Sequence, residues 1–245
     1  MPKNSPQLHV FPTADAVLEA LANFFVATAH HAVAERGRFA VALSGGSSPK
    51  KLYELLASPT YRARIAWEKV FFFFGDERNV PQTSPESNYL MAKTALFDPL
   101  GIAPAQVFAV DTTLDPAEAA AQYGAAIEEF FGDEPARFDL VLLGLGDNAH
   151  TASLFPHTDV LHTQAVGVQK VFVAELNAVR ITMTAPLLNQ ARATAFLVYG
   201  AGKALAVQQI LEGPRDADQY PAQLIAPGNG HVHWFMDAAA AVDLK

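Results

Sequence analysis

The chain has 245 residues, of which 51% are hydrophobic and 17% charged, and its formal net charge is −8. This apolar content excludes a disordered chain, and the length allows a sizeable buried core. No stripe of Lys or Arg is visible along the chain, so we expect no nucleic-acid partner. Cysteine is absent, which excludes disulfides, thiol nucleophiles and thiolate metal sites and agrees with a reducing compartment.

The amino-terminal residues lack the apolar core of a secretory signal peptide. The apolar run at residues 70–74 is far too short to span a bilayer. We therefore expect a soluble cytoplasmic protein that does not bind a membrane.

Predicted elements alternate between helices and buried strands along the chain. Apolar residues from Val17 to Ala32 recur at helical spacing, and Gly37 is expected to end that helix. Residues 38–46 predict a buried strand that runs into two glycines, and Pro49 suits the first turn of the next helix. Further strands are expected over residues 69–78, 106–110, 138–146, 192–200 and 231–236, and further helices over 87–96, 115–131 and 203–211.

Continuous apolar strands that alternate with helices are typical of an α/β fold. We expect a doubly wound, mostly parallel sheet with helices on both faces. Residues 1–245 are expected to form a single domain, with a small subdomain at 166–183. Ligands of such sheets bind beyond the carboxyl ends of the strands. The loops expected there are 44–48, 75–78, 144–150 and 200–203.

The first of these loops has the composition of an anion site. Gly45 and Gly46 let the backbone approach a ligand closely, and Ser44 and Ser47 add hydroxyl groups before a helix amino end. Neither the P-loop nor the dinucleotide pattern is present, which favours a simple phosphate over a nucleotide. A tight turn with a serine N-cap is the alternative interpretation.

The other loops add charged and titratable side chains. Arg78 suits bidentate binding of a phosphate, and Asp76 suits a sugar hydroxyl or a base. His150 follows two glycines at a strand end and suits a general base near neutral pH. Lys203 suits an anion. The alternative for the three charged residues is that they are solvated at the surface. The alternative for His150 is a hydrogen-bonded structural histidine.

The loops and the segments beside them carry a set of motifs in a fixed order: "SGGSSP" (44–49), "GDERNVP" (75–81), "SNY" (87–89), "GLGDNAHTASLFP" (144–156), "RITMTAPLLNQA" (180–191) and "GAGK" (200–203). Taken together, these motifs resemble the 6-phosphogluconolactonase family. The related glucosamine-6-phosphate deaminases share the fold and the first loop, but they generally lack the Arg of "DER" and the "TASLFP" segment.

The resemblance implies hydrolysis of 6-phospho-D-glucono-1,5-lactone to 6-phosphogluconate in the pentose phosphate pathway, without a metal or other cofactor. It implies that His150 activates water and that Arg78 and Lys203 hold the phosphate. Arg180 matches a motif position to which we assign no firm role. The other positions expected to bind the substrate are Ser44, Gly45, Gly46, Ser47, Asp76 and Asn148.

One departure from the family pattern lies beside the histidine. Where the pattern reads Gly-x-Asp-Gly-His, this chain has Asn148 and Ala149 before His150. An Asn side chain accepts a hydrogen bond but carries no charge to stabilise an imidazolium. The Cβ of Ala149 penalises a positive φ if the turn needs one. Asp147 lies one residue early, and the sequence leaves open whether it compensates.

Two other functions stay open at this point. A non-catalytic sugar-phosphate-binding module is one, although the chain has no room for a DNA-binding domain. A glucosamine-6-phosphate deaminase or isomerase is the other; Asp76 could act as its base, but Asn148 removes a second carboxylate. His231 and His233 lack a nearby carboxylate, so we expect no metal site. The oligomeric state is not readable from the sequence.

Overall fold

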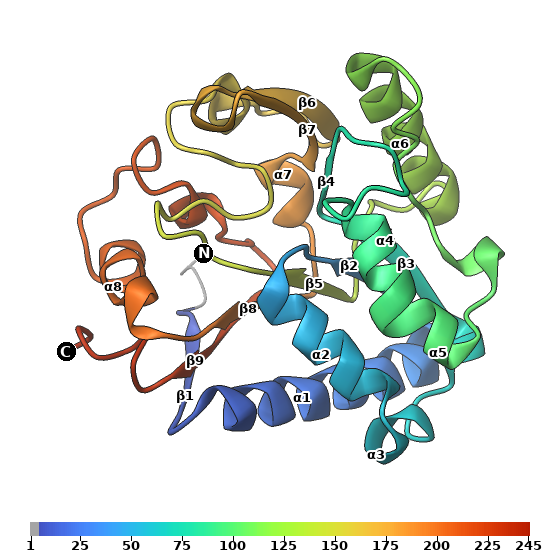
Figure 1. The fold of residues 1–245 in the computed structure, drawn as a ribbon, viewed down its shortest axis with the longest axis horizontal. Coiled ribbons are helices and arrows are strands. Elements are labelled where there is room, and N and C mark those ends of the chain that lie inside the picture. The colour runs from blue at the N-terminus through green and yellow to red at the C-terminus, as the bar shows by residue number, and fades with distance from the viewer. Residues whose placement is uncertain (1–4) are drawn as a thin grey trace.

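The computed structural model describes residues 5–245 (Figure 1). Its strands are β1 Gln7–Phe11, β2 Phe39–Leu43, β3 Val70–Phe74, β4 Asp76–Arg78, β5 Leu140–Leu143, β6 Val168–Val173, β7 Ala178–Met183, β8 Ala193–Val198 and β9 His231–Asp237. Its α-helices are α1 Ala14–Arg36, α2 Ser47–Ala57, α3 Pro59–Arg62, α4 Asn88–Ala92, α5 Asp98–Leu100, α6 Pro116–Phe131, α7 Ala185–Leu188 and α8 Ala204–Leu211.

Six strands form one parallel sheet in the order β1-β9-β8-β5-β2-β3, which confirms the predicted doubly wound sheet. Strand order reverses between β2 and β5. From β2 the chain moves outward to β3, whereas from β5 it moves the other way through β8 to β9. Loops that leave the two strands diverge at such a reversal, and a crevice for ligands opens between them.

Helices cover both faces of this sheet, and the strands are apolar on both faces for that reason. In β2, Phe39, Val41 and Leu43 pack into the core that includes residues of α1 and α2. Ala40 and Ala42, which point the other way, pack into a second core with residues of α6. Figure 1 shows α1 and α2 on one side of the sheet and α6 on the other.

The first helix is predicted correctly, including its end. Thr13 caps α1 through its Oγ1, and Gly37 ends it with a left-handed φ of 72°. By length and composition α1 is apolar enough to cross a membrane. It buries one face instead, as a core helix does, and the buried residues are Val17, Leu18, Leu21, Ala22, Phe25, Val26, Ala29 and Ala32.

A second, antiparallel sheet has the order β4-β7-β6. Its β6–β7 hairpin occupies the region predicted as a small subdomain. The sequence predicts one strand over 69–78, but the structure divides it at Gly75 into β3 and β4. The Gly75 N–H donates to the Leu43 carbonyl, and its own carbonyl accepts from Met183 N, so Gly75 joins the two sheets.

Two predicted elements need correction. The prediction of a strand over 106–110 is wrong. A 3₁₀ turn at Pro104–Gln106 leads into this segment, which forms only a single β-bridge, between Phe72 and Val107. The helix expected over 87–96 begins as α4 but changes at Lys93–Phe97 into a π-helical turn. Strand β1 was not predicted.

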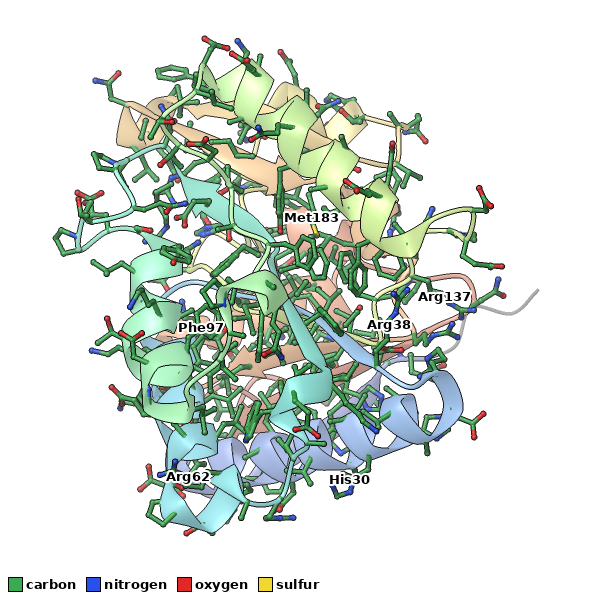
Figure 2. The ribbon with its side chains drawn as sticks, turned by 90° about the vertical axis from the view of Figure 1, so that its right-hand side faces the viewer. His30, Arg38, Arg62, Phe97, Arg137 and Met183 are labelled. Carbon is green, nitrogen blue, oxygen red and sulfur yellow. The ribbon has the colours of Figure 1, made fainter. Side chains whose placement is uncertain are left out.

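An ionic cluster fixes the amino ends of the central strands, at the edge of the sheet away from the loops after β2 and β5. Asp139, before β5, accepts from Arg36 at 2.9 Å and from the Ala40 N–H at 2.8 Å. Arg36 and Asp139 line a surface pocket at this edge. Two further arginines, Arg38 and Arg137, line the same pocket and lie close together in Figure 2.

Candidate active site

A cavity of about 450 Å³ lies at the carboxyl ends of β2, β5 and β8 and draws on all four predicted loops. Asn148 does not line it. Sequence reasoning missed Leu197, Val198 and Tyr199, which line the cavity from the end of β8. The predicted residues that do line it are Ser44, Gly45, Gly46, Ser47, Asp76, Arg78, His150, Arg180 and Lys203.

The glycine-serine loop is held rigidly at the end of β2. A Cβ on Gly45 would lie 2.0 Å from Oδ1 of Asn88, so only glycine fits there. Gly46 has a φ of 103° and directly precedes α2. The Tyr53 hydroxyl bonds both the N–H and the carbonyl of Ser44, at 2.9 and 2.8 Å. The loop therefore presents the amino end of α2 to the cavity.

Asp76 is a fixed carboxylate in the wall of the cavity. It is 7% exposed, and its Oδ2 accepts a 2.6 Å hydrogen bond from the Ser153 hydroxyl. The Asn88 amide donates to its Oδ1 at 3.4 Å and to its carbonyl at 2.8 Å. These contacts suit an acceptor that orients substrate hydroxyl groups.

Two arginines face each other across the small sheet. Arg78 on β4 lies directly opposite Arg180 on β7. Burial, and then the charge of Arg78, lower the pKa of Arg180. Both Nε atoms are buried without a hydrogen-bond partner among residues 5–245. Like charges placed opposite each other cost stability, so this pair is suited to hold an anion between them.

Lys203 supplies a third cation from the 3₁₀ turn Ala201–Lys203 that precedes α8. Its Nζ lies 2.5 Å from Oδ1 of Asp147. The carboxylate of Asp147 is therefore bound to Lys203 and acts on His150 only through space. Asp147 therefore replaces the aspartate expected at position 148 only in part: its charge acts on His150, but its carboxylate is bound to Lys203.

His150 has one defined tautomer. Its Nδ1 lies 2.6 Å from Oδ1 of Asn148, and because a carbonyl oxygen only accepts, Nδ1 carries the proton and Nε2 is left as the basic nitrogen. The ring stacks on Phe155 with centroids 3.9 Å apart. A Cβ on Gly146 would lie 2.1 Å from Nδ1, so glycine is required for the ring to occupy this position.

The surroundings of His150 keep the imidazole neutral at pH 7. Burial lowers its pKa to about 4, and the positive charges of Lys203, Arg180 and Arg78 contribute to the lowering. The charge of Asp147 acts in the opposite direction. A neutral imidazole with a free Nε2 is able to accept a proton.

The turn before His150 needs the conformation that alanine disfavours. Ala149 has a φ of 62°, and its N–H donates to the Gly146 carbonyl at 3.0 Å. A non-glycine residue in this region costs about 1 kcal/mol. The penalty expected from the sequence is therefore present in the fold.

Sequence reasoning missed one residue that belongs to the same network. Glu175 accepts a 2.9 Å hydrogen bond from Nδ2 of Asn148. It comes from the tip of the β6–β7 hairpin, 27 residues away in the chain, and no local motif indicates it.

The histidines of β9 do not assemble a metal centre. His233 bonds His9 on β1, with 3.2 Å between Nδ1 of His233 and Nε2 of His9. Within residues 5–245, no three or more His, Cys, Asp or Glu side chains gather to hold a metal ion. Catalysis without a metal stays a prediction.

The chain is similar to known proteins along almost its whole length. Residues 12–234 match the family model described as glucosamine-6-phosphate isomerases/6-phosphogluconolactonase. A protein of Nostoc sp. named 6-phosphogluconolactonase is 40% identical over 244 residues, which cover 97% of this chain and 98% of the relative. A protein of Synechocystis sp. with the same name is 40% identical over 247 residues, covering 98% and 99%.

Solved structures agree with this match. A crystal structure of devB protein superposes with a TM-score of 0.88 at 34% identity, covering 98% of this chain and 99% of that one. The 6-phosphogluconolactonase from Trypanosoma cruzi superposes with a TM-score of 0.87 at 26% identity over the full length of both chains. A monomeric glucosamine-6-phosphate deaminase, at 18% identity and a TM-score of 0.80, shares the fold.

Proposed function

Because the chain belongs to the glucosamine-6-phosphate isomerase/6-phosphogluconolactonase family, we propose that it hydrolyses 6-phospho-D-glucono-1,5-lactone to 6-phosphogluconate, a step of the pentose phosphate pathway. The names of the 40% identical relatives support the lactonase over the deaminase branch. One observation carries the mechanism: a neutral histidine shares its cavity with three cationic side chains.

The phosphate group is the part of the substrate that the cations of the cavity bind. Arg78 and Arg180 hold it through guanidinium groups whose Nε atoms have no other partner among residues 5–245, and Lys203 adds a third positive charge. A phosphate monoester carries close to two negative charges at neutral pH, so it relieves the repulsion between the two arginines. Binding through the phosphate also fixes the position of the lactone ring, which lowers the entropic barrier of the reaction.

Hydrolysis needs one activated water. Nε2 of His150 takes a proton from that water as its oxygen attacks the lactone carbonyl carbon. The tetrahedral intermediate then collapses, and the bond between the carbonyl carbon and the ring oxygen breaks. The imidazolium returns its proton to the departing ring oxygen, which leaves a hydroxyl group and a carboxylic acid that ionises. Neither a nucleophilic side chain nor an added reactant takes part.

The developing oxyanion lies near donors that the fold already provides. The first N–H groups of a helix have no partner within the helix, and α2 begins at Ser47, beside the cavity. Backbone donors of residues 45–48 therefore stabilise the negative charge on the carbonyl oxygen. Such preorganised donors contribute roughly 3 kcal/mol each in acyl-transfer enzymes.

Residues 1–245 are proposed to act as one sugar-phosphate lactonase domain. A cytoplasmic location, the absence of nucleic-acid and membrane partners, and catalysis without a cofactor stay predictions. The acidic net charge of −8 does not oppose an anionic substrate, because cations gathered in one cavity dominate the local field.

The experiment compares the phosphorylated lactone with D-glucono-1,5-lactone, which lacks the phosphate. The wild-type protein is expected to prefer the phosphorylated lactone at least about 100-fold in kcat/KM, since charged hydrogen bonds are worth roughly 1.5–3 kcal/mol each. Arg180→Gln is expected to erase most of that preference, mainly by raising KM for the phosphorylated lactone. Equal rates for both lactones with the wild-type protein would contradict the proposal.

A further inference from the structure

The side-chain amide of Asn148 lies between His150 and a carboxylate that is outside the cavity. Its Oδ1 accepts from Nδ1 of His150 at 2.6 Å and from the His150 backbone N–H at 3.2 Å. Its Nδ2 donates to Oε1 of Glu175 at 2.9 Å. The amide is thus engaged at both ends, and the hydrogen bonds run in one direction from His150 to Glu175.

The position of Glu175 is set by the small sheet. It lies in the 3₁₀ turn Ala174–Leu176 between β6 and β7, and Asn177 closes that turn with a left-handed φ of 46°. The last pair of the hairpin, Val173 with Ala178, lies directly beside the turn. Glu175 is exposed and does not line the cavity, and its side-chain hydrogen bond to Asn148 is what connects it to the site.

We propose that Glu175 is a positioning residue for His150: its carboxylate holds and polarises the Asn148 amide and supplies the negative charge that this amide lacks. The inference rests on the proposed role of His150 as the base. When Nε2 takes a proton, the ring becomes positive and its Nδ1–H bond to Asn148 strengthens. A carboxylate bonded to the far end of the amide makes Oδ1 a better acceptor at that moment.

The other charged groups that face His150 do not provide this support. Lys203, Arg180 and Arg78 are cations and disfavour the imidazolium. Asp147 is the one nearby acid that acts on the ring through space, but its carboxylate is bonded to Lys203. Of the carboxylates among residues 5–245, Glu175 is therefore the one that a continuous line of hydrogen bonds connects to the imidazole.

The benefit of Glu175 depends on the amide at position 148. This dependence distinguishes a positioning role of Glu175 from a purely structural one. In an Asn148→Asp variant, a carboxylate oxygen would replace Nδ2 and lie near 2.9 Å from Oε1 of Glu175. Two like charges at that distance repel. Glu175 should therefore help catalysis beside the native amide and oppose it beside an aspartate.

The test is a double-mutant cycle on lactone opening by the purified full-length protein. Glu175→Gln is expected to lower kcat by about 5- to 10-fold with KM changed less than about twofold, because the substrate phosphate does not contact this residue. Glu175→Asp keeps the charge and is expected to recover part of kcat. In the Asn148→Asp background, Glu175→Gln should leave kcat unchanged or raise it.

Glu129→Gln is the matched control, since it removes the same charge from an exposed position on α6 and should leave kcat and KM unchanged. An active wild-type protein whose kcat is insensitive to Glu175→Gln would overturn the inference. Equal losses with Asn148 and with Asn148→Asp would also overturn it, because they indicate a structural role. A wild-type protein without lactonase activity would contradict the proposed function instead.

Discussion

At the scale of single residues, the position of the His150 ring depends on a glycine. A Cβ at Gly146 would lie 2.1 Å from Nδ1 of His150 and 2.9 Å from Oδ1 of Asn148. We predict that Gly146→Ala displaces the ring and lowers kcat by roughly 100-fold, the scale of loss expected from an ångström of misplacement. Gly75→Ala is the control, because its nearest contact would be an ordinary 3.5 Å. Equal activities of the two variants, both folded, would contradict this geometry.

The residues beside His150 also show what the sequence reveals and what it does not. The penalty at Ala149 was predictable, because a Cβ conflicts with a positive φ wherever the turn requires one. The partner of Asn148 was not, since Glu175 comes from a hairpin 27 residues away and only tertiary packing brings the two together. The local sequence pattern predicts which residues have side chains suited to the reaction. Long-range contacts decide the orientation and the hydrogen-bond partners of those side chains.

At the scale of elements, Glu77 ties β4 to the amino end of α4. It is 1% exposed, and its carboxylate accepts from the N–H groups of Asn88 and Tyr89 and from the Ser87 hydroxyl. Glu77→Gln would replace an acceptor with an amide N–H that faces donors. We predict a loss of about 2–4 kcal/mol in the free energy of unfolding, measured with urea. An unchanged midpoint would show that these contacts do not stabilise the fold.

The alternation of side chains along β4 explains why Glu77 is structural while its neighbours are not. Successive residues of a strand point to opposite faces, so Asp76 and Arg78 reach the cavity and Glu77 points away from it. The sequence predicts one strand over 69–78 and does not separate Glu77 from its neighbours, because a strand of three residues after Gly75 has no apolar pattern to indicate it. The small sheet was therefore predicted only as a subdomain over 166–183, without its strands.

At the scale of the whole molecule, a histidine pair joins the edge strand β1 to the sheet. His233 is largely buried against His9 and Phe24, and burial and the two neighbouring histidines, His9 and His231, lower its pKa to about 4. An unfolded chain binds this proton near pH 6.5, whereas the folded protein binds it only near pH 4. The folded state therefore loses stability as the pH falls through that window.

We predict that His233→Gln flattens this dependence. Wild-type protein should lose on the order of 1–3 kcal/mol more than the variant between pH 7.5 and pH 4.5, as measured by urea unfolding. His31→Gln removes an exposed histidine of α1 and should retain the wild-type pH dependence. A His233→Gln variant as sensitive to acid as the wild-type protein would assign the effect to other groups.

The main sheet was largely predictable because its strands are apolar on both faces and alternate with helices, which permits few architectures. Strand β1 was missed because it is an edge strand, and its residues range from intermediate to exposed. The segment at 106–110 is apolar, but it meets the edge strand β3 at a single bridge. Pairing partners, which the sequence does not state, decide such marginal strands.

The most direct test of the central claim is the rate of lactone opening. The substrate is generated in situ, and proton release is followed with wild-type protein and with His150→Gln, against the spontaneous background. We predict that the wild-type protein accelerates the reaction and that the variant loses about 10²- to 10⁴-fold in kcat, the usual contribution of a general base, while it still binds 6-phosphogluconate. Hydrolysis by the variant at the wild-type rate would show that His150 is not the base.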